Sequence, residues 1–258
     1  MGIEFMGNGV KPRPDQAKSI ERLTGRYLGT KLPSSISVSG EAGKFSPEGA
    51  PLFFPGNTFI CHLDPASEEA KALTELQEGI LTGPAGDYFA FVPPASFHMT
   101  MFQGVCGSPL DESDWPSGVV KGESLSTIND EFKKRLESGI AFSPVNIIPE
   151  EFLDGHWLAV VGETELDIEK LWSARRILQD LTGLIRANYN DYRFHITTVY
   201  QRKWMSDVVA IRHLNHSEEL YRKFLKKVER FRLNQVTFCE FENMHKYSKI
   251  VVVPAKRN

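Results

Sequence analysis

Cysteine is scarce in this chain, and neither sign of charge dominates. The 258 residues include three cysteines, and the net charge is −3 from 30 basic and 33 acidic residues. The thiols of Cys61, Cys106 and Cys239 are scattered and form no C-x-x-C pair, which excludes a disulfide framework and a zinc knuckle and favours a cytoplasmic protein. The balanced charge provides no general basic field, so a long duplex nucleic acid is not an expected partner.

Long hydrophobic runs are also missing. No segment approaches the roughly 20 apolar residues of a membrane-spanning helix, so no membrane partner is expected. The hydrophobic content of 41% suffices for one large domain or two closely packed lobes in a monomer. Residues 1–56 are rich in Gly, Pro and Ser and predict an N-terminal covering arm, whereas residues 57–258 predict the main domain. Residues 1–5 are predicted to be a cloning remnant, because Glu4-Phe5 matches a common cloning site and Met6 resembles a natural start.

The pattern H-x-T occurs twice, as His98 with Thr100 and as His195 with Thr197. Both copies lie in apolar runs typical of β-strands, in which successive side chains point to opposite faces. The histidine and the threonine of each copy therefore share one face, while the apolar neighbours face the core. The plainer alternative is two unrelated strands, each with a buried structural histidine.

The flanks of the two copies repeat as well. A strand at residues 57–63 precedes a helix that begins near Asp64 or Ser67, and a strand at residues 156–161 precedes a helix that begins near Thr164. The two H-x-T copies lie 97 positions apart, and the strands before them keep nearly the same offset. This regularity predicts a duplicated strand–helix–strand unit.

The remaining pattern predicts an α+β fold of two pseudo-symmetric lobes, with mainly antiparallel sheets flanking a central cleft and helices outside. Thr127 is predicted to cap one helix, and residues 146–152 are expected to be irregular. Other expected elements are helices with apolar stripes at residues 70–80, 128–136, 171–181 and 217–232, and a hairpin of residues 236–242 and 248–253.

The paired H-x-T copies resemble the 2H (two-histidine) phosphoesterase superfamily, which includes RNA-ligase-like and cyclic phosphodiesterase proteins. The resemblance extends from about Gly43 onward, and residues 54–58 and 97–105 are similar to a little-characterised subgroup. Many members carry Phe or Arg five positions after the histidine. Here Gln103 and Tyr200 occupy those positions. This departure concerns the choice of substrate, whereas the residues of the expected chemistry are all present.

Two imidazoles and two hydroxyls around one cleft supply what hydrolysis of a phosphodiester requires. An imidazole titrates near pH 6.5, so one can act as base while the other, protonated, acts as acid. Thr100 and Thr197 would donate hydrogen bonds to the phosphate oxygens. We therefore predict a metal-independent phosphodiesterase without a cofactor, with catalytic His98, Thr100, His195 and Thr197. The resemblance implies a 2′,3′-cyclic phosphate or a 2′–5′ linkage of a nucleotide or short RNA end as substrate. The alternatives are a binding module without turnover and a 2′–5′ RNA ligase.

Three further residues are candidates for substrate binding. Lys44 is predicted either to contact a phosphate or to be an ordinary solvated lysine. By strict alternation Phe102 lies on the His98 face, where it either stacks on a base or fills the floor of the cleft. Tyr200 falls on the core face unless a bulge turns it toward the ligand.

Two other features are weaker candidates. His213 and His216 have a spacing found in metal sites, but no third ligand lies nearby in a coherent motif. The basic residues of the predicted helix 217–232 are either a solvated face or an RNA contact. Residues 40–45 superficially resemble a phosphate loop, but they lack its G-x-x-x-x-G-K-S/T spacing, which argues against a nucleoside triphosphatase.

Overall fold

The computed structural model describes residues 16–39, 43–113, 115–137, 139–187 and 189–253. The predicted cloning remnant at residues 1–5 lies outside this part of the chain. In chain order the helices and strands are α1 (Ala17–Leu23), β1 (Gly56–His62), α2 (Glu68–Leu81), β2 (Phe89–Phe91), β3 (His98–Cys106), α3 (Leu125–Leu136), β4 (Val145–Leu153), β5 (Trp157–Gly162), α4 (Glu165–Thr182), β6 (His195–Thr197), β7 (Val199–Gln201), α5 (Asp207–Leu225), β8 (Phe231–Leu233), β9 (Val236–Asn243) and β10 (Lys246–Val253).

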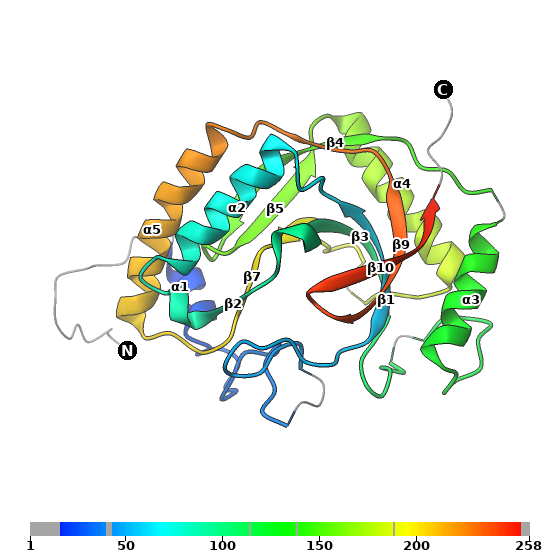
Figure 1. The fold of residues 1–258 in the computed structure, drawn as a ribbon, viewed down its shortest axis with the longest axis horizontal. Coiled ribbons are helices and arrows are strands. Elements are labelled where there is room, and N and C mark those ends of the chain that lie inside the picture. The colour runs from blue at the N-terminus through cyan, green and yellow to red at the C-terminus, as the bar shows by residue number, and fades with distance from the viewer. Residues whose placement is uncertain (1–15, 40–42, 114, 138, 188, 254–258) are drawn as a thin grey trace.

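Eight of the strands form one curled antiparallel sheet in the order β10-β9-β1-β3-β6-β5-β4-β8, with helices on its outer side (Figure 1). A second sheet contains only β2 and β7. The predicted α+β class is confirmed. The two expected lobes are the two four-stranded halves of this one sheet, because β3 and β6 pair at Met99 and Ile196 and join the halves edge to edge.

The predicted duplication is visible in the topology. In the first half, β1 leads through α2 to β3, and β1 pairs with β3. In the second half, β5 leads through α4 to β6, and β5 pairs with β6. Each H-x-T strand is therefore bordered by the strand that opens its own unit and by the H-x-T strand of the other unit.

Side-chain caps set the beginnings of the helices. Ser67 and Thr164 accept hydrogen bonds from the backbone N–H three residues later, as their predicted places at the start of α2 and α4 require. The prediction for α3 is wrong: Ser124 is the cap, and Thr127 is the residue whose N–H it accepts. Ser and Thr are both good caps, so the local pattern did not separate them.

Two other predicted elements differ from the structure. The helix expected at residues 217–232 is α5, Asp207–Leu225. It begins ten residues earlier because Ser206 caps it, and it ends earlier because Phe231 belongs to β8. Residues 146–152 are not irregular but lie in β4, which pairs with both β5 and β8. The interior position of β4 in the sheet imposes the extended backbone despite Pro149.

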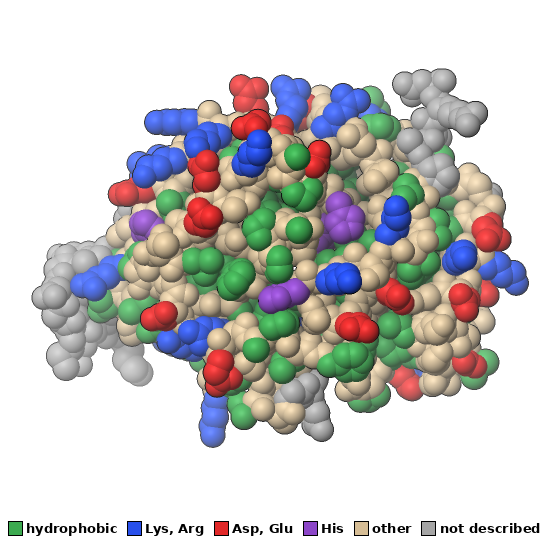
Figure 2. Space-filling model, in the orientation of Figure 1, with side chains coloured by type: hydrophobic (Ala, Val, Ile, Leu, Met, Phe, Trp, Pro, Cys, Tyr) green, Lys and Arg blue, Asp and Glu red, His purple; other side chains and the backbone are tan. Residues whose placement is uncertain are grey.

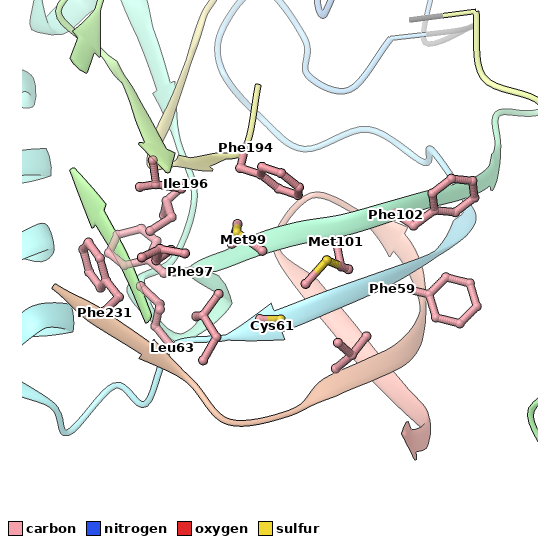
Figure 3. Packing of buried hydrophobic residues seen from close by; sticks show 14 of the residues in the cluster. Phe59, Cys61, Leu63, Phe97, Met99, Met101, Phe102, Phe194, Ile196 and Phe231 are labelled. Carbon is pink, nitrogen blue, oxygen red and sulfur yellow. The ribbon is translucent and has the colours of Figure 1, made fainter. Parts of the chain in front are cut away.

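The core lies against the face of the strands opposite to the H-x-T side chains. Met99, Met101 and Ile196 are almost completely buried there, in one hydrophobic cluster with Phe97 and Phe194 (Figure 3). Alternate residues of β3 and β6 therefore divide between core and cleft, as the strand periodicity predicted.

The segment before β1 contains more structure than a covering arm. Helix α1 buries Ile20 and Leu23 in a small core beneath α5, and Phe45 is completely buried in the main core. No helix in the described part of the chain is long and apolar enough to cross a membrane.

The junction between the two halves of the sheet predicts a large stability effect. Ile196→Ala should lower the free energy of unfolding by about 2–5 kcal/mol, because the side chain is completely buried and its removal leaves a cavity. Urea unfolding at neutral pH measures the change. Ile185→Ala is the control, since that side chain is 80% exposed and its truncation should stay within about 0.5 kcal/mol of zero. Equal effects would contradict the junction described here.

Candidate active site

The pairing of β3 with β6 places both H-x-T copies on one surface. Because Met99 and Ile196 are antiparallel partners, His98 lies beside Thr197 and Thr100 lies beside His195. The two histidines are diagonal neighbours, which corresponds to roughly 7–8 Å between their backbones. All four side chains are half-buried and line a single cavity. The structure thus brings together the four predicted catalytic residues in a quartet with approximate two-fold symmetry.

Both imidazoles are held by the same local hydrogen bond. The Nδ1 of His98 lies 2.7 Å from the carbonyl oxygen of Ser96, and the Nδ1 of His195 lies 2.9 Å from that of Arg193. A carbonyl only accepts, so Nδ1 carries the hydrogen in each ring. In the neutral imidazole Nε2 is then left with its lone pair, ready to accept a proton.

The surroundings keep both rings neutral in the free protein. Burial lowers the pKa of His98 to about 4, opposed by the bond to Ser96 and assisted by the nearby His62 and His195. Burial likewise lowers the pKa of His195 to about 4, opposed by the bond to Arg193 and assisted by the Lys44 ammonium. An anion bound between the rings would favour their charged forms and raise both pKa values.

The neighbours of the two imidazoles differ. The His98 ring meets the Tyr247 ring edge to face at 4.4 Å between centroids, and burial raises the pKa of Tyr247 well above its ordinary value, so its phenol stays a donor. The His195 ring packs on Trp157 at 4.1 Å. The position of β1 that faces His98 holds His62, whereas the position of β5 that faces His195 holds Ala159.

A β-bulge after the first H-x-T copy corrects the prediction for Phe102. Phe59 pairs with Phe102 and the next residue of β1 pairs with Thr100, so Met101 is the extra residue. Met101 and Phe102 both turn to the core, and Phe102 is completely buried. Stacking of Phe102 on a base is therefore incompatible with the structure, and the ring fills the floor beneath the cleft.

A break between two strands follows the second copy and turns Tyr200 into the cavity. Thr198 separates β6 of the large sheet from β7 of the small one, and Thr198 and Val199 are both buried. The alternation resumes one position later, so Tyr200 lines the cavity, as Gln103 does after the bulge of β3. The positions five residues after each histidine thus face the same space from opposite sides.

Lys44 also lines the cavity. Its ammonium lies 5.2 Å from the centre of the Tyr200 ring and 5.8 Å from that of Phe54. This geometry matches cation–π contact and places the charge at the mouth of the site rather than in free solvent. Figure 2 shows histidine side chains at the surface close to basic and hydrophobic ones near the centre of this face.

Arg186, Met244 and Tyr247 are among the cavity residues that were not predicted from the sequence. Arg186 donates to the carbonyl oxygens of Gln103 (2.9 Å) and Gly104. Met244 accepts hydrogen bonds from the hydroxyls of Tyr200 and Tyr247, at 3.6 and 3.7 Å. No local pattern in the sequence marks Arg186, or Met244 and Tyr247 of the β9–β10 hairpin, as cavity residues.

The weaker candidates do not assemble a second site. His213 bonds to the carbonyl of Asp154, and His216 bonds to that of Gly79, so their rings serve different partners. Among the described residues no group of three His, Cys, Asp or Glu side chains is placed to hold a metal ion. On α5 and the turn after it, several basic side chains pair with carboxylates: Arg222 with Glu218, Lys227 with Glu75, and Arg230 with Glu163.

Comparisons with known proteins concern the family and the fold. Residues 44–147, which include the first H-x-T copy, match the family model 2H-phosphodiest, described as a domain of unknown function (DUF1868). The resemblance to two-histidine phosphoesterases is thereby confirmed. No curated protein matches the chain.

A solved structure of a conserved protein of unknown function from Agrobacterium tumefaciens shares the fold, with 25% identity and a TM-score of 0.80 over 92% of this chain and 99% of that one. A solved phosphoesterase (10% identity, TM-score 0.44) and Usb1 of Kluyveromyces marxianus with uridine monophosphate (14%, TM-score 0.39) are more distant; each aligns over 78% of this chain and 98% of its own.

The buried histidines predict a specific dependence on pH. The two imidazoles should titrate near pH 4 in the free protein, well below the ordinary value of about 6.5, and inorganic phosphate should raise both values. Between pH 6.5 and 4 the unfolded chain then binds more protons than the folded one. The free energy of unfolding therefore falls as the pH is lowered through this window.

Two measurements check this prediction. Heteronuclear NMR of the imidazole rings reports each titration, and urea unfolding at several pH values reports the slope. His98→Gln with His195→Gln should flatten the slope without abolishing it, because burial also lowers the pKa of His213, to about 3. Imidazoles that titrate near 6.5 without phosphate would contradict the described burial.

Proposed function

We propose that this protein is a phosphodiesterase that hydrolyses a 2′,3′-cyclic phosphate or a 2′–5′ linkage of a nucleotide or RNA end. The observation that supports it most directly is the quartet of His98, Thr197, Thr100 and His195 around one cavity. The family match at residues 44–147 supports the same class of chemistry.

The reaction needs one neutral and one protonated imidazole. Nε2 of one histidine takes a proton from water as the water oxygen bonds to phosphorus. The other imidazolium gives its Nε2 proton to the ribose oxygen as the P–O bond breaks. Both rings are neutral in the free protein. The charge of the bound anionic substrate raises the pKa of the nearby imidazole, so that ring takes up the required proton from solvent when the substrate binds. Each histidine can take either role.

The remaining cavity groups suit the rest of a nucleotide. The hydroxyls of Thr100 and Thr197 donate to non-bridging phosphate oxygens, where negative charge grows in the transition state. The Lys44 ammonium adds a positive charge, and the Tyr200 ring beneath it adds an aromatic wall to the same cavity. Catalysis needs no metal ion in this scheme, because the imidazoles supply both the acid and the base.

Substitution of the four quartet residues separates turnover from binding. His98→Ala and His195→Ala should each lower kcat by at least about 10²-fold, while Thr100→Ala and Thr197→Ala should lower it about 10-fold. The assay uses 2′,3′-cyclic nucleotides, RNA with a cyclic-phosphate end, 2′–5′ oligonucleotides and cyclic dinucleotides. Binding of a nucleotide without turnover of any of these would favour the binding module. Joining of RNA ends would favour the ligase. Wild-type rates in both histidine variants would show that the motifs are structural.

The proton that the reaction requires predicts how the rate depends on pH. The free protein holds that proton only weakly, so kcat/KM should fall as the pH rises from 5 to 9. The falling limb of kcat should lie at higher pH, because bound phosphate raises the imidazole pKa. Both limbs should be unchanged in EDTA. Loss of activity in EDTA and its return with zinc or manganese would contradict the metal-independent scheme.

A further inference from the structure

Two buried polar side chains reach the backbone just after the H-x-T copies, at the bulge of β3 and at the break between β6 and β7. Arg175 of α4 donates from Nη1 to the carbonyl oxygen of Met101 at 2.7 Å. Gln77 of α2 donates from Nε2 to the carbonyl oxygen of Thr198 at 2.7 Å and to that of Val92 at 2.8 Å. Both residues are almost inaccessible, with exposures of 1% and 3%.

The two contacts are related by the internal repeat. Met101 and Thr198 each come three residues after the histidine of their copy, and Gln77 and Arg175 keep the same spacing of about 98 positions as the rest of the repeat. The contacts are also crossed: the helix of the first unit holds the strand of the second, and the helix of the second holds the strand of the first.

Burial of a charged arginine here has a cost that core packing alone does not explain. The Arg175 guanidinium lies 3.7 Å from the centre of the Tyr192 ring, and the Phe102 and Phe194 rings lie within 6 Å. Burial is the largest cause of the lowered pKa of Arg175. The groups that oppose this shift are the side chains of Tyr192 and Tyr189, and no carboxylate of the described residues is among them. Burial of a charge in such a position is costly unless hydrogen bonds compensate for the lost hydration. The bond to the carbonyl of Met101 is one such compensation.

The carbonyls that these side chains hold lie beside the reacting groups. Tyr192, which packs on Arg175, donates its hydroxyl to the carbonyl of Thr100 at 3.2 Å. The carbonyls of Thr100 and Met101 are thus both fixed from the core side. The bulge of β3 and the break after β6 set which residues face the cavity, so a shift at either place would move the threonine before it and the cavity residue after it together.

We propose that Gln77 and Arg175 are positioning residues that hold the two half-sites in register, each from the helix of the opposite half. The inference deepens the proposed function by naming what keeps the quartet and the Gln103 and Tyr200 walls aligned. The crossed hydrogen bonds also couple the two halves of the sheet, whatever reaction the cavity carries out.

The test compares Gln77→Leu and Arg175→Met, which keep most of the side-chain volume but remove the donors. The controls are Leu73→Ala on α2 and Leu178→Ala on α4, completely buried neighbours whose side chains carry no hydrogen-bond donor for Met101 or Thr198. Backbone NMR should show a crossed pattern. Gln77→Leu should shift the amides of residues 197–200 most, and Arg175→Met those of residues 100–103. The controls should shift residues near their own helices.

Kinetics provide the second readout. In an active protein both donor variants should lower kcat about 10- to 100-fold with KM changed less than about 3-fold, because small displacements of reacting groups cost rate rather than binding. Arg175→Lys, which keeps a donor and the charge, should recover part of the rate. The controls should lower the melting temperature at least as much without this loss of kcat.

The outcomes separate the inference from the proposed function. A crossed NMR pattern without any turnover would support the positioning role and count against the phosphodiesterase. Shifts confined to each residue's own half, or a loss of kcat that merely follows the melting temperature across donors and controls, would overturn the positioning role. If Arg175→Met does not fold, Gln77→Leu and Arg175→Lys give the same decision.

Discussion

The antiparallel contact between Met99 and Ile196 determines the rest of this molecule. It joins two halves that are otherwise similar into one sheet, and it fixes the phase of both H-x-T strands at once. A slip of one residue in either strand would send its histidine and threonine into the core. Both central side chains are completely buried, so the hydrophobic effect opposes such a slip.

Near-symmetry at the centre gives way to asymmetry at the walls. The imidazoles share their burial and their carbonyl contacts, but Tyr247 packs on one ring and Trp157 on the other. The cavity residues five positions after the histidines also differ, a glutamine in one half and a tyrosine in the other. Paired strands β2 and β7 support Tyr200, whereas an arginine side chain supports the carbonyl of Gln103. A nearly symmetric pair of imidazoles thus lies between unlike walls.

The buried imidazoles and the buried guanidinium lower the stability of the fold, and they hold the side chains of the cavity in fixed positions. Both imidazoles are kept neutral by burial, and a guanidinium lies among aromatic rings behind the bulge of β3. Replacing such groups with apolar ones of similar volume commonly costs little or even stabilises a fold. Their positions, within one or two residues of the H-x-T motifs or bonded to the backbone beside them, locate the functional constraint in this part of the sheet.

Local periodicity was sufficient for much of this description. Alternation in the two apolar runs placed each histidine with its threonine, the constant offset of the flanking elements predicted the duplication, and apolar stripes located α2 and α4. These features depend on neighbours in sequence, and the physics of strands and helices acts at that range.

Tertiary contacts decided the remainder. Strict alternation placed Phe102 in the cleft and Tyr200 in the core. The bulge at Met101 reverses the first assignment, and the break at Thr198 between β6 and β7 reverses the second. The strand β4, Arg186 at the cavity and the crossed bonds from Gln77 and Arg175 depend on pairing between segments distant in sequence. The sequence alone thus determined which residues are the candidates for the chemistry. Only the packed sheet decided how they face one another, because register and bulges are set by the partner strand and not by the strand itself.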